Sequence, residues 1–277
     1  AGMVYLFSFT DTSFSGGLLE AGIGYGYTGG KNVNISPGAY SDFGYGLSLN
    51  AAGDRLAVGA HGQDTQTGRV HLFTFTDTNF SGGALAGSIG YNLTGGKNIN
   101  VPTLQTYDEF GQGVSLNAAG DRLAVGAHYS DGASNSQGNA GEVYLFTFTD
   151  TSFSGGALAA TIGYGYTGGN NIDLTSTLAA GDEFGQSVSL NAAGDRLAVS
   201  AHGDDGFNDA LNNAGAVHLF SFTDDSFSGG ALEATMGYDY AGGKNVNVAS
   251  LGDDDEFGYG LSLNGAGNRL AVGAFYD

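Results

Sequence analysis

The fold is decided by the stretch Phe184-Gly-Gln-Ser-Val-Ser-Leu190, the turn Asn191-Ala-Ala-Gly194 and the segment Arg196-Leu-Ala-Val-Ser-Ala201. Apolar and polar residues alternate along the first segment, and this period of two predicts a β-strand. The short turn leads into a second, largely apolar strand. The two segments are therefore expected to form an antiparallel hairpin.

Close copies of this stretch recur along the whole chain at a spacing of about 70 residues, which predicts a repeat architecture. Phe43-Gly44, Phe110-Gly111 and Phe257-Gly258 begin the other copies, and Arg-Leu-Ala-Val follows each of them. A catalytic site is usually unique to one place in a protein. Recurrence of the same residues in four units therefore favours a structural role for them.

Each unit continues with a loop of variable length and two more strands, as at residues 216–222 and 231–240. Four antiparallel strands per unit are thus expected. In the third of these strands both faces are apolar, as in Val143-Tyr-Leu-Phe-Thr-Phe148, so each sheet needs cover on two sides. A β-propeller covers each four-stranded blade with a neighbour on either side, and an open array or solenoid of stacked sheets is the alternative.

The chain is predicted to be a single repeat domain over residues 1–277. It divides into a half-blade at 1–40, blades at about 41–107, 108–181 and 182–254, and a half-blade at 255–277. The first half-blade holds only the last two strands of a unit, and the second holds only the first two. If the two halves pair, the propeller has four blades, and two open sheet edges are hidden.

The composition is strongly acidic: 28 Asp and Glu face 8 Lys and Arg, for a formal net charge of −20. Phosphate backbones and anionic membranes would be repelled, so nucleic acid is excluded as a partner. The sequence contains no Cys, which excludes disulfides and thiolate metal sites. No apolar stretch is long enough for membrane insertion.

The Phe-Gly strand, the following Leu-Ala-Val segment and Gly215-Ala-Val-His-Leu-Phe220 resemble the FG-GAP repeat. The version here is similar to that of large secreted bacterial adhesins and haemagglutinin-like surface proteins and, more distantly, to the integrin α propeller. The resemblance implies a β-propeller used for extracellular or cell-surface binding, and it names no ligand.

Calcium is the one cofactor that the acidic loops suggest. Calcium-binding members of that family carry several Asp in the turn of the first hairpin, whereas the turns here hold one carboxylate or none, as at Asn191-Ala-Ala-Gly-Asp195. Asn and Asp in these turns are expected to shape the backbone. Ca²⁺ ligands are instead predicted in two acidic segments, at Asp204, Asp205, Asp209, Asp253, Asp254 and Asp255.

Other recurring polar residues are interpreted as structural. His61, His128 and His202 follow the second strand of their units, with Phe275 in the fourth, and these positions are expected to lie well apart. The Arg residues that open the second strands are expected to pair with the acids before each Phe-Gly, such as Glu109. No nucleophile elbow, zinc-type His spacing or phosphate loop is present, so the protein is predicted not to be an enzyme.

Two functions remain from this reading. The first is a non-enzymatic extracellular bacterial surface or matrix protein, a propeller used for adhesion or as a structural, filament-forming element. Its partner would be a surface protein or glycan of a host or neighbouring cell, or a second copy bound head to tail. The second is a lectin with repeated sites, in which Tyr25, Tyr27, Tyr164 and Tyr166 stack on sugar rings.

Overall fold

The computed structural model describes residues 2–150 and 152–277. Ala1, the first position of the predicted half-blade 1–40, and Thr151, within the predicted blade 108–181, lie outside the described residues. In this part of the chain the strands form five sheets in an all-β fold. Three sheets have five strands each, and the sheets at the two ends have three and two.

The complete sheets follow one another in the chain. The first contains β4 (Leu47–Leu49), β5 (Arg55–Gly59), β6 (Arg69–Thr74), β7 (Ala84–Gly90) and β8 (Ile99–Asn100). The second contains β9 (Val114–Leu116), β10 (Arg122–Ala127), β11 (Glu142–Thr147), β12 (Ala157–Gly163) and β13 (Ile172–Asp173). The third contains β14 (Phe184–Leu190), β15 (Arg196–Ala201), β16 (Ala216–Ser221), β17 (Ala231–Gly237) and β18 (Val246–Asn247).

The terminal sheets are partial copies of these. One contains β1 (Met3–Ser8), β2 (Leu18–Gly24) and β3 (Val33–Asn34), and the other contains β19 (Phe257–Leu263) and β20 (Leu270–Ala274). The helical segments are the short α1 (Gln63–Gln66) and η1 (Ala133–Asn135). A helix with the length and apolarity to cross a bilayer does not occur among the described residues.

The predicted hairpin is confirmed, but the prediction of four strands per unit is wrong. β14 and β15 pair in antiparallel fashion as expected, while a short fifth strand runs parallel to the fourth in each complete sheet. An Asn side chain next to this fifth strand links it to the fourth: Thr161 N–H donates to Asn171 Oδ1 at 2.8 Å. β17 ends at Gly237 rather than at Tyr240, because Asp239 has a φ of 58° and cannot continue a strand.

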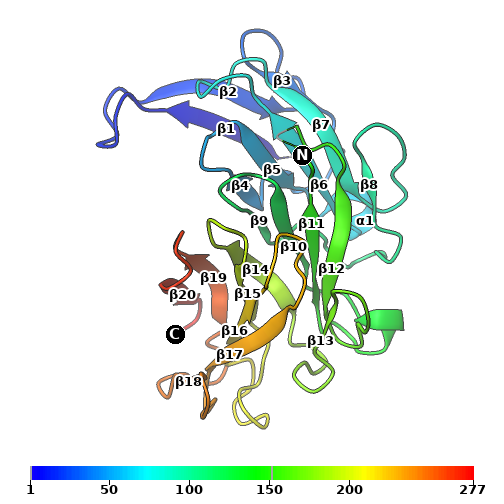
Figure 1. Cartoon of the computed structure of the whole chain (residues 1–277), viewed down its shortest axis with the longest axis vertical. Helices are drawn as coiled ribbons and strands as arrows, with labels where there is room; N and C mark the ends of the chain where they lie inside the picture. The colour runs from blue at the N-terminus through cyan, green and yellow to red at the C-terminus, as the bar shows by residue number, and fades with distance from the viewer. Residues whose placement is uncertain (1, 151) are drawn as a thin grey trace.

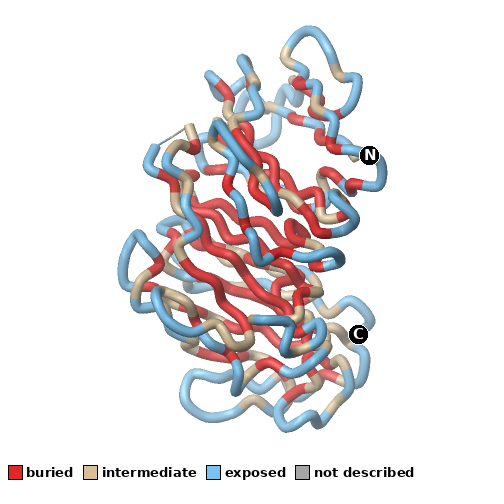
Figure 2. The backbone as a smooth tube through the Cα atoms, turned by 90° about the vertical axis from the view of Figure 1, so that its right-hand side faces the viewer, coloured by how far each residue is buried: buried red, intermediate tan, exposed pale blue. Residues whose placement is uncertain are grey.

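The sheets stack face to face, and buried residues run through the middle of the stack (Figure 2). Phe220, Phe222 and Phe227 of one sheet share a core with Leu145 and Ile162 of the sheet before it. The same arrangement recurs between the first and second complete sheets and between the β1–β3 sheet and the first complete sheet. Both faces of the third strand are therefore covered in the interior of the stack, as its two apolar faces predict: β11 is buried along its length up to half-buried Thr147.

The two terminal sheets lie at opposite ends of the stack, with β1–β3 at one end and β19–β20 at the other (Figure 1). Within the described residues no ladder of hydrogen bonds joins β1 to β20, so each of these strands keeps one open edge.

Equivalent first strands lie next to one another and are joined by serine side chains. Ser48 Oγ accepts a hydrogen bond from Leu116 N–H at 2.8 Å, and Ser115 Oγ accepts one from Leu190 N–H at 2.9 Å. Ser189 repeats the contact to Leu263 at 3.0 Å. A single polar position in the repeat thus fixes the register between successive sheets.

Candidate functional site

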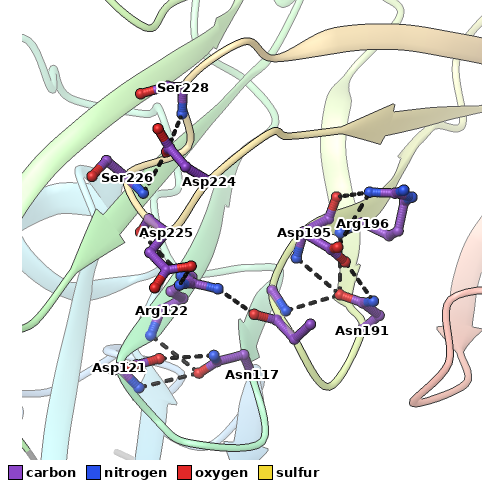
Figure 3. A network of polar contacts seen from close by, with 12 residues as sticks. Asn117, Asp121, Arg122, Asn191, Asp195, Arg196, Asp224, Asp225, Ser226 and Ser228 are labelled. Carbon is purple, nitrogen blue, oxygen red and sulfur yellow. Dashed lines mark hydrogen bonds and ion pairs between the residues drawn. The ribbon is translucent and has the colours of Figure 1, made fainter.

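The hairpin turns form a polar network that joins successive units (Figure 3). Asn117 Oδ1 accepts hydrogen bonds from the backbone N–H groups of Gly120, Asp121 and Arg122, at 2.9, 3.1 and 3.1 Å. Asn117 Nδ2 donates to Asp121 Oδ1 at 2.8 Å. Asn and Asp therefore shape these turns, as the sequence predicts.

Within the described residues, no ion pair joins Arg122 or Arg196 to the acids before Phe-Gly that the sequence analysis assigned to them. Arg122 donates to the carbonyl of Ala193 in the next turn and to the carbonyl of Asp225, and it forms an ion pair with Asp225 at 2.7 Å. Arg55 donates to the carbonyl of Ala119 at 3.1 Å. The ion pair of Arg122 runs between repeats, whereas Arg55 and Arg196 lie within 3.4 and 3.5 Å of Asp54 and Asp195 in their own turns. The acids before Phe-Gly lie at the other end of the strands.

Those acids lie beside the recurring histidines instead. The closest N to O distances are 3.6 Å for His61 and Asp42, 3.7 Å for His128 and Glu109, and 2.9 Å for His202 and Glu183. The expectation that the histidines lie well apart is wrong for one pair, because the rings of His128 and His202 are 6.3 Å apart between centroids. Equivalent positions converge here since the first strands of successive sheets are neighbours.

A cavity of about 410 Å³ is lined by two of these pairs, His128 with Glu109 and His202 with Glu183. Gln112, Gln186, Tyr129 and Tyr259 also line it. Burial, together with His202 and His61, lowers the pKa of His128 to about 3. Burial raises the pKa of Glu109 to about 7, and the nearby carboxylates of Asp42 and Glu183 add to the effect. The acids and histidines of this cavity recur at fixed positions in each repeat, and the sequence shows that recurrence. The sequence does not show that these positions meet, because they do so only where the first strands of successive sheets lie side by side.

The acids of the third variable loop lie in a separate cavity of about 550 Å³. Asp204, Asp205 and Asp209 all line it, together with Asp182 and Tyr240. Asp204 is only 3% exposed; its carboxylate accepts hydrogen bonds from Gly206 N–H at 2.8 Å and from the Tyr240 hydroxyl at 2.9 Å. Burial raises the pKa of Asp204 to about 6.

The second acidic segment docks on this loop. Asn212 N–H donates to Asp253 Oδ1 at 2.9 Å, and the side-chain amides of Asn212 and Asn213 each donate to Asp254 Oδ1 at 3.0 Å. Asp255 accepts a hydrogen bond from Gly252 N–H at 2.7 Å. The structure thus brings together two segments that the sequence analysis treated separately, and it uses their carboxylates to hold loop backbone.

Calcium binding at these six acids stays a prediction. The described residues include no group of three or more His, Cys, Asp or Glu with the geometry to hold a metal ion. Asp205 also has a structural contact, because its Oδ1 accepts a hydrogen bond from Asn213 N–H at 2.7 Å and closes the loop. Asp131 makes the same contact with Asn139 N–H at 2.8 Å in the preceding unit, so an Asp that closes the variable loop by accepting a backbone hydrogen bond recurs in both units.

The four tyrosines proposed for sugar stacking have different environments. Tyr25 is exposed, whereas the hydroxyl of Tyr27 lies 3.0 Å from that of Tyr5. Tyr164 is half-buried, and its side chain lies against Gly132. Tyr166 is half-buried, and burial together with the nearby carboxylate of Glu142 raises the pKa of its hydroxyl. The tyrosines therefore do not form two equivalent exposed pairs.

The fold and these contacts define a tandem-repeat, all-β protein whose units share one scaffold. The family comparison matches residues 104–146 and 175–220 to the FG-GAP repeat, so the chain contains FG-GAP repeats, as the sequence predicts. No curated protein matches the sequence. Among solved structures, the crystal structure of Sqt1 from Saccharomyces cerevisiae is similar with a TM-score of 0.36 and 11% identity, over 71% of this chain and 36% of that chain. The chain thus spans 36% of the length of that structure.

Proposed function

We propose that this chain is a non-enzymatic, extracellular bacterial surface or matrix protein that serves in adhesion or as a structural element. The observation that carries the proposal is the contrast between constant and variable parts. Hairpin turns, serine contacts and core phenylalanines recur from unit to unit, while the loops after β5, β10 and β15 differ in length and sequence. Loops of this kind on a rigid scaffold commonly carry binding functions.

The closure of the sheets into a four-bladed propeller is part of the same proposal. The strands β19 and β20 correspond to the first two strands of a unit, and β1, β2 and β3 correspond to the remaining three. Pairing of these two partial sheets would complete a fourth blade of a propeller. An arrangement of this kind removes exposed strand edges, which otherwise promote uncontrolled association.

Surface location is tested with antibodies raised against the chain, applied to intact and to permeabilised cells of the bacterium that produces it. We expect labelling of intact cells or of their extracellular matrix. Labelling that requires permeabilisation would contradict the proposal.

Adhesion is tested with beads coated with the chain and added to cultured epithelial cells or to a bacterial biofilm. The matched variant replaces residues 202–215 with the shorter loop at residues 61–68, since both loops connect equivalent strands. We expect the cells or the biofilm to retain at least several-fold fewer beads coated with the loop variant than beads coated with the unmodified chain. Equal retention of both bead types and of uncoated beads would leave only the structural role.

The lectin function is the second candidate, and one observation favours it. In the 550 Å³ cavity, Phe207 is 47% exposed and lies 5.9 Å from Tyr240 between ring centroids. Thr175, Asn208 and Asp209 line the same cavity. An aromatic face beside hydroxyl, amide and carboxylate groups suits a sugar ring. A glycan array tests it, with Phe207→Ala expected to abolish binding and Phe14→Ala as the exposed control; a silent array would exclude this candidate.

A further inference from the structure

The 410 Å³ cavity is lined by acids from successive units and has no basic residue to balance them. Glu109, Glu183 and Glu256 line it, and no Lys or Arg is among the described residues that do so. Asp42 precedes the Phe-Gly of the first unit as these glutamates do in theirs. The carboxylates affect one another, because Asp42 and Glu183 add to the burial that raises the pKa of Glu109. The cavity therefore concentrates negative charge at one place in the fold and attracts cations.

These four acids share a backbone conformation that residues other than glycine rarely adopt. The φ angle is 51° at Asp42, 56° at Glu109, 55° at Glu183 and 51° at Glu256. A left-handed backbone is strained for a residue with a side chain, and Gly would adopt it without that strain. All four units nevertheless place a carboxylate there. Backbone geometry alone therefore does not explain the choice of residue.

Two buried glutamines line the same cavity and have amide oxygens without a donor. Gln112 is 8% and Gln186 is 7% exposed, and within the described part of the chain Oε1 of each has no hydrogen-bond partner. They occupy equivalent positions, three residues after Glu109 and Glu183. A buried amide oxygen that lost its bonds to water and gained none in return is unfavourable. The group that this cavity lacks is therefore a hydrogen-bond donor with a positive charge.

A bare metal ion does not meet this requirement, but an ammonium group does. The described residues include no group of three or more His, Cys, Asp or Glu that could hold a metal ion. The carboxylates thus line a space of about 410 Å³ instead of converging on one point. An ammonium group donates three hydrogen bonds and is attracted to the faces of aromatic rings. Tyr129 and Tyr259 provide rings of this kind in the cavity.

A second cavity, of about 380 Å³, continues from the first and suits an aliphatic chain. Gln112, Gln186 and Tyr259 line both cavities. Val114 and Val188 add apolar surface to the second, whose lining comes from the first strands β4, β9, β14 and β19. A ligand with a charged end at the glutamates and methylene groups beside the valines therefore fits the two cavities together.

We propose that the two cavities form a binding site for a small aliphatic amine, with its ammonium group at Glu109 and Glu183 and its methylene groups toward Val114 and Val188. Binding replaces the repulsion between carboxylates by charge-assisted hydrogen bonds. The glutamates, glutamines and valines that carry this inference all belong to the second and third units, in the interior of the chain. The inference goes beyond the proposed surface role and does not depend on it.

Isothermal titration calorimetry of the whole chain with 1,4-diaminobutane tests the site, and 1,4-butanediol is the neutral probe of the same length. We expect one saturable site per chain for the diamine and none for the diol. Glu183→Gln should weaken binding by about 10-fold or more, since it removes one charge-assisted contact. No saturable binding of the diamine, or equal binding of the diol, would overturn the proposal.

The matched control variant is Asp239→Asn, which should leave binding unchanged. Asp239 is also an acid with a left-handed backbone, at a φ of 58°, and it is absent from the lining of both cavities. An equal loss of affinity in Glu183→Gln and Asp239→Asn would mean that the diamine responds to the overall negative charge, and the proposed site would be wrong.

Gln186→Met separates a contact with the ligand from a structural role. The change removes the unpartnered amide with little change in volume, so the ligand-free variant should melt at the same or a higher temperature than the unmodified chain. Its affinity for the diamine should nevertheless fall several-fold. Circular dichroism checks that both cavity variants are folded, and Gln186→Met carries the test if Glu183→Gln does not fold.

Competition provides the last measurement. We expect CaCl₂ to displace the diamine no better than NaCl at the same ionic strength, because the cavity lacks the geometry for a metal ion. Displacement by CaCl₂ at least 10-fold more effective than by NaCl would identify a metal site and overturn the amine. Unchanged affinity in a folded Gln186→Met variant would likewise place the diamine outside these cavities.

Discussion

The interior sheet β9–β13 and the terminal sheet β1–β3 have nearly the same sequence in their shared strands, yet they differ in how much of that sequence is buried. Val143-Tyr-Leu-Phe146 is fully enclosed, whereas in Val4-Tyr-Leu-Phe7 only Val4 and Leu6 are buried. The difference arises because each unit covers one face of its neighbour and depends on another neighbour for its second face. How much a residue contributes to the stability of the protein therefore depends on the position of its sheet in the stack, as in other repeat proteins.

The largest test of this comparison is truncation of the same phenylalanine in both sheets. Phe146→Ala removes a fully buried ring and should lower the free energy of unfolding by about 3–5 kcal/mol. Phe7→Ala should cost less than about 1 kcal/mol when measured on the monomer, because its ring is more than half exposed. Chemical denaturation of both variants checks the difference, and equal losses would contradict it.

A second test compares two arginines at equivalent positions. Arg122 is buried and bonded to the next unit. The guanidinium of Arg196, in contrast, donates to the carbonyl of Asp195 in its own turn and lies 3.5 Å from the carboxylate of that residue. Arg122→Met should lower stability by about 2–3 kcal/mol, since it removes the hydrogen bonds and the ion pair that a buried charged group makes to the next unit. Arg196→Met should stay within about 0.5 kcal/mol of the unmodified chain. A denaturation midpoint shift of similar size in both variants would argue against the inter-unit role.

A third test uses pH. Burial raises the pKa of Asp182 from its ordinary value of 3.8 to about 7. The folded protein therefore keeps a proton that the unfolded chain releases, so the contribution to stability is complete below about pH 4 and is lost as pH rises through about 7. The effect of Asp182→Asn on the free energy of unfolding should therefore be about 1–2 kcal/mol more favourable at pH 8 than at pH 4.

The control for the pH test is Asp255→Asn at the terminal position. Asp255 makes the same turn contact, to Gly252 N–H rather than to Ala179 N–H, but it is less buried. Thermal melts of the two variants across pH 4 to 8 should show the larger change for Asp182→Asn. A pH profile of the Asp182 variant that parallels the unmodified chain would remove Asp182 from this account.

The smallest expected effect concerns the serine contacts between first strands. Ser115→Ala deprives Leu190 N–H of its acceptor and should cost about 1 kcal/mol. Ser262 is the counterpart in β19, and the described residues place no further first strand beside it, so Ser262→Ala should be nearly neutral in residues 1–277.

Local features were predictable from the residues because they depend on near neighbours. The alternation in Phe184–Leu190, the hairpin to Arg196–Ala201 and the role of Asn117 in its turn all follow from contacts within a few residues. The fifth strand was missed since it is only two residues long and is held by an Asn side chain ten residues from its partner. The docking of Asn212 on Asp253 was missed because it spans 41 residues.

The sequence by itself determined the strands, their turns, the repeat and the need for cover on both sheet faces. Only the tertiary structure decided that His128 approaches His202, that Arg122 contacts Asp225 and that the terminal sheets stay apart. The physical reason is that strand formation is set by local alternation and turn chemistry. Which equivalent positions meet depends instead on the angle between stacked sheets, and that angle is fixed by packing across the whole interface.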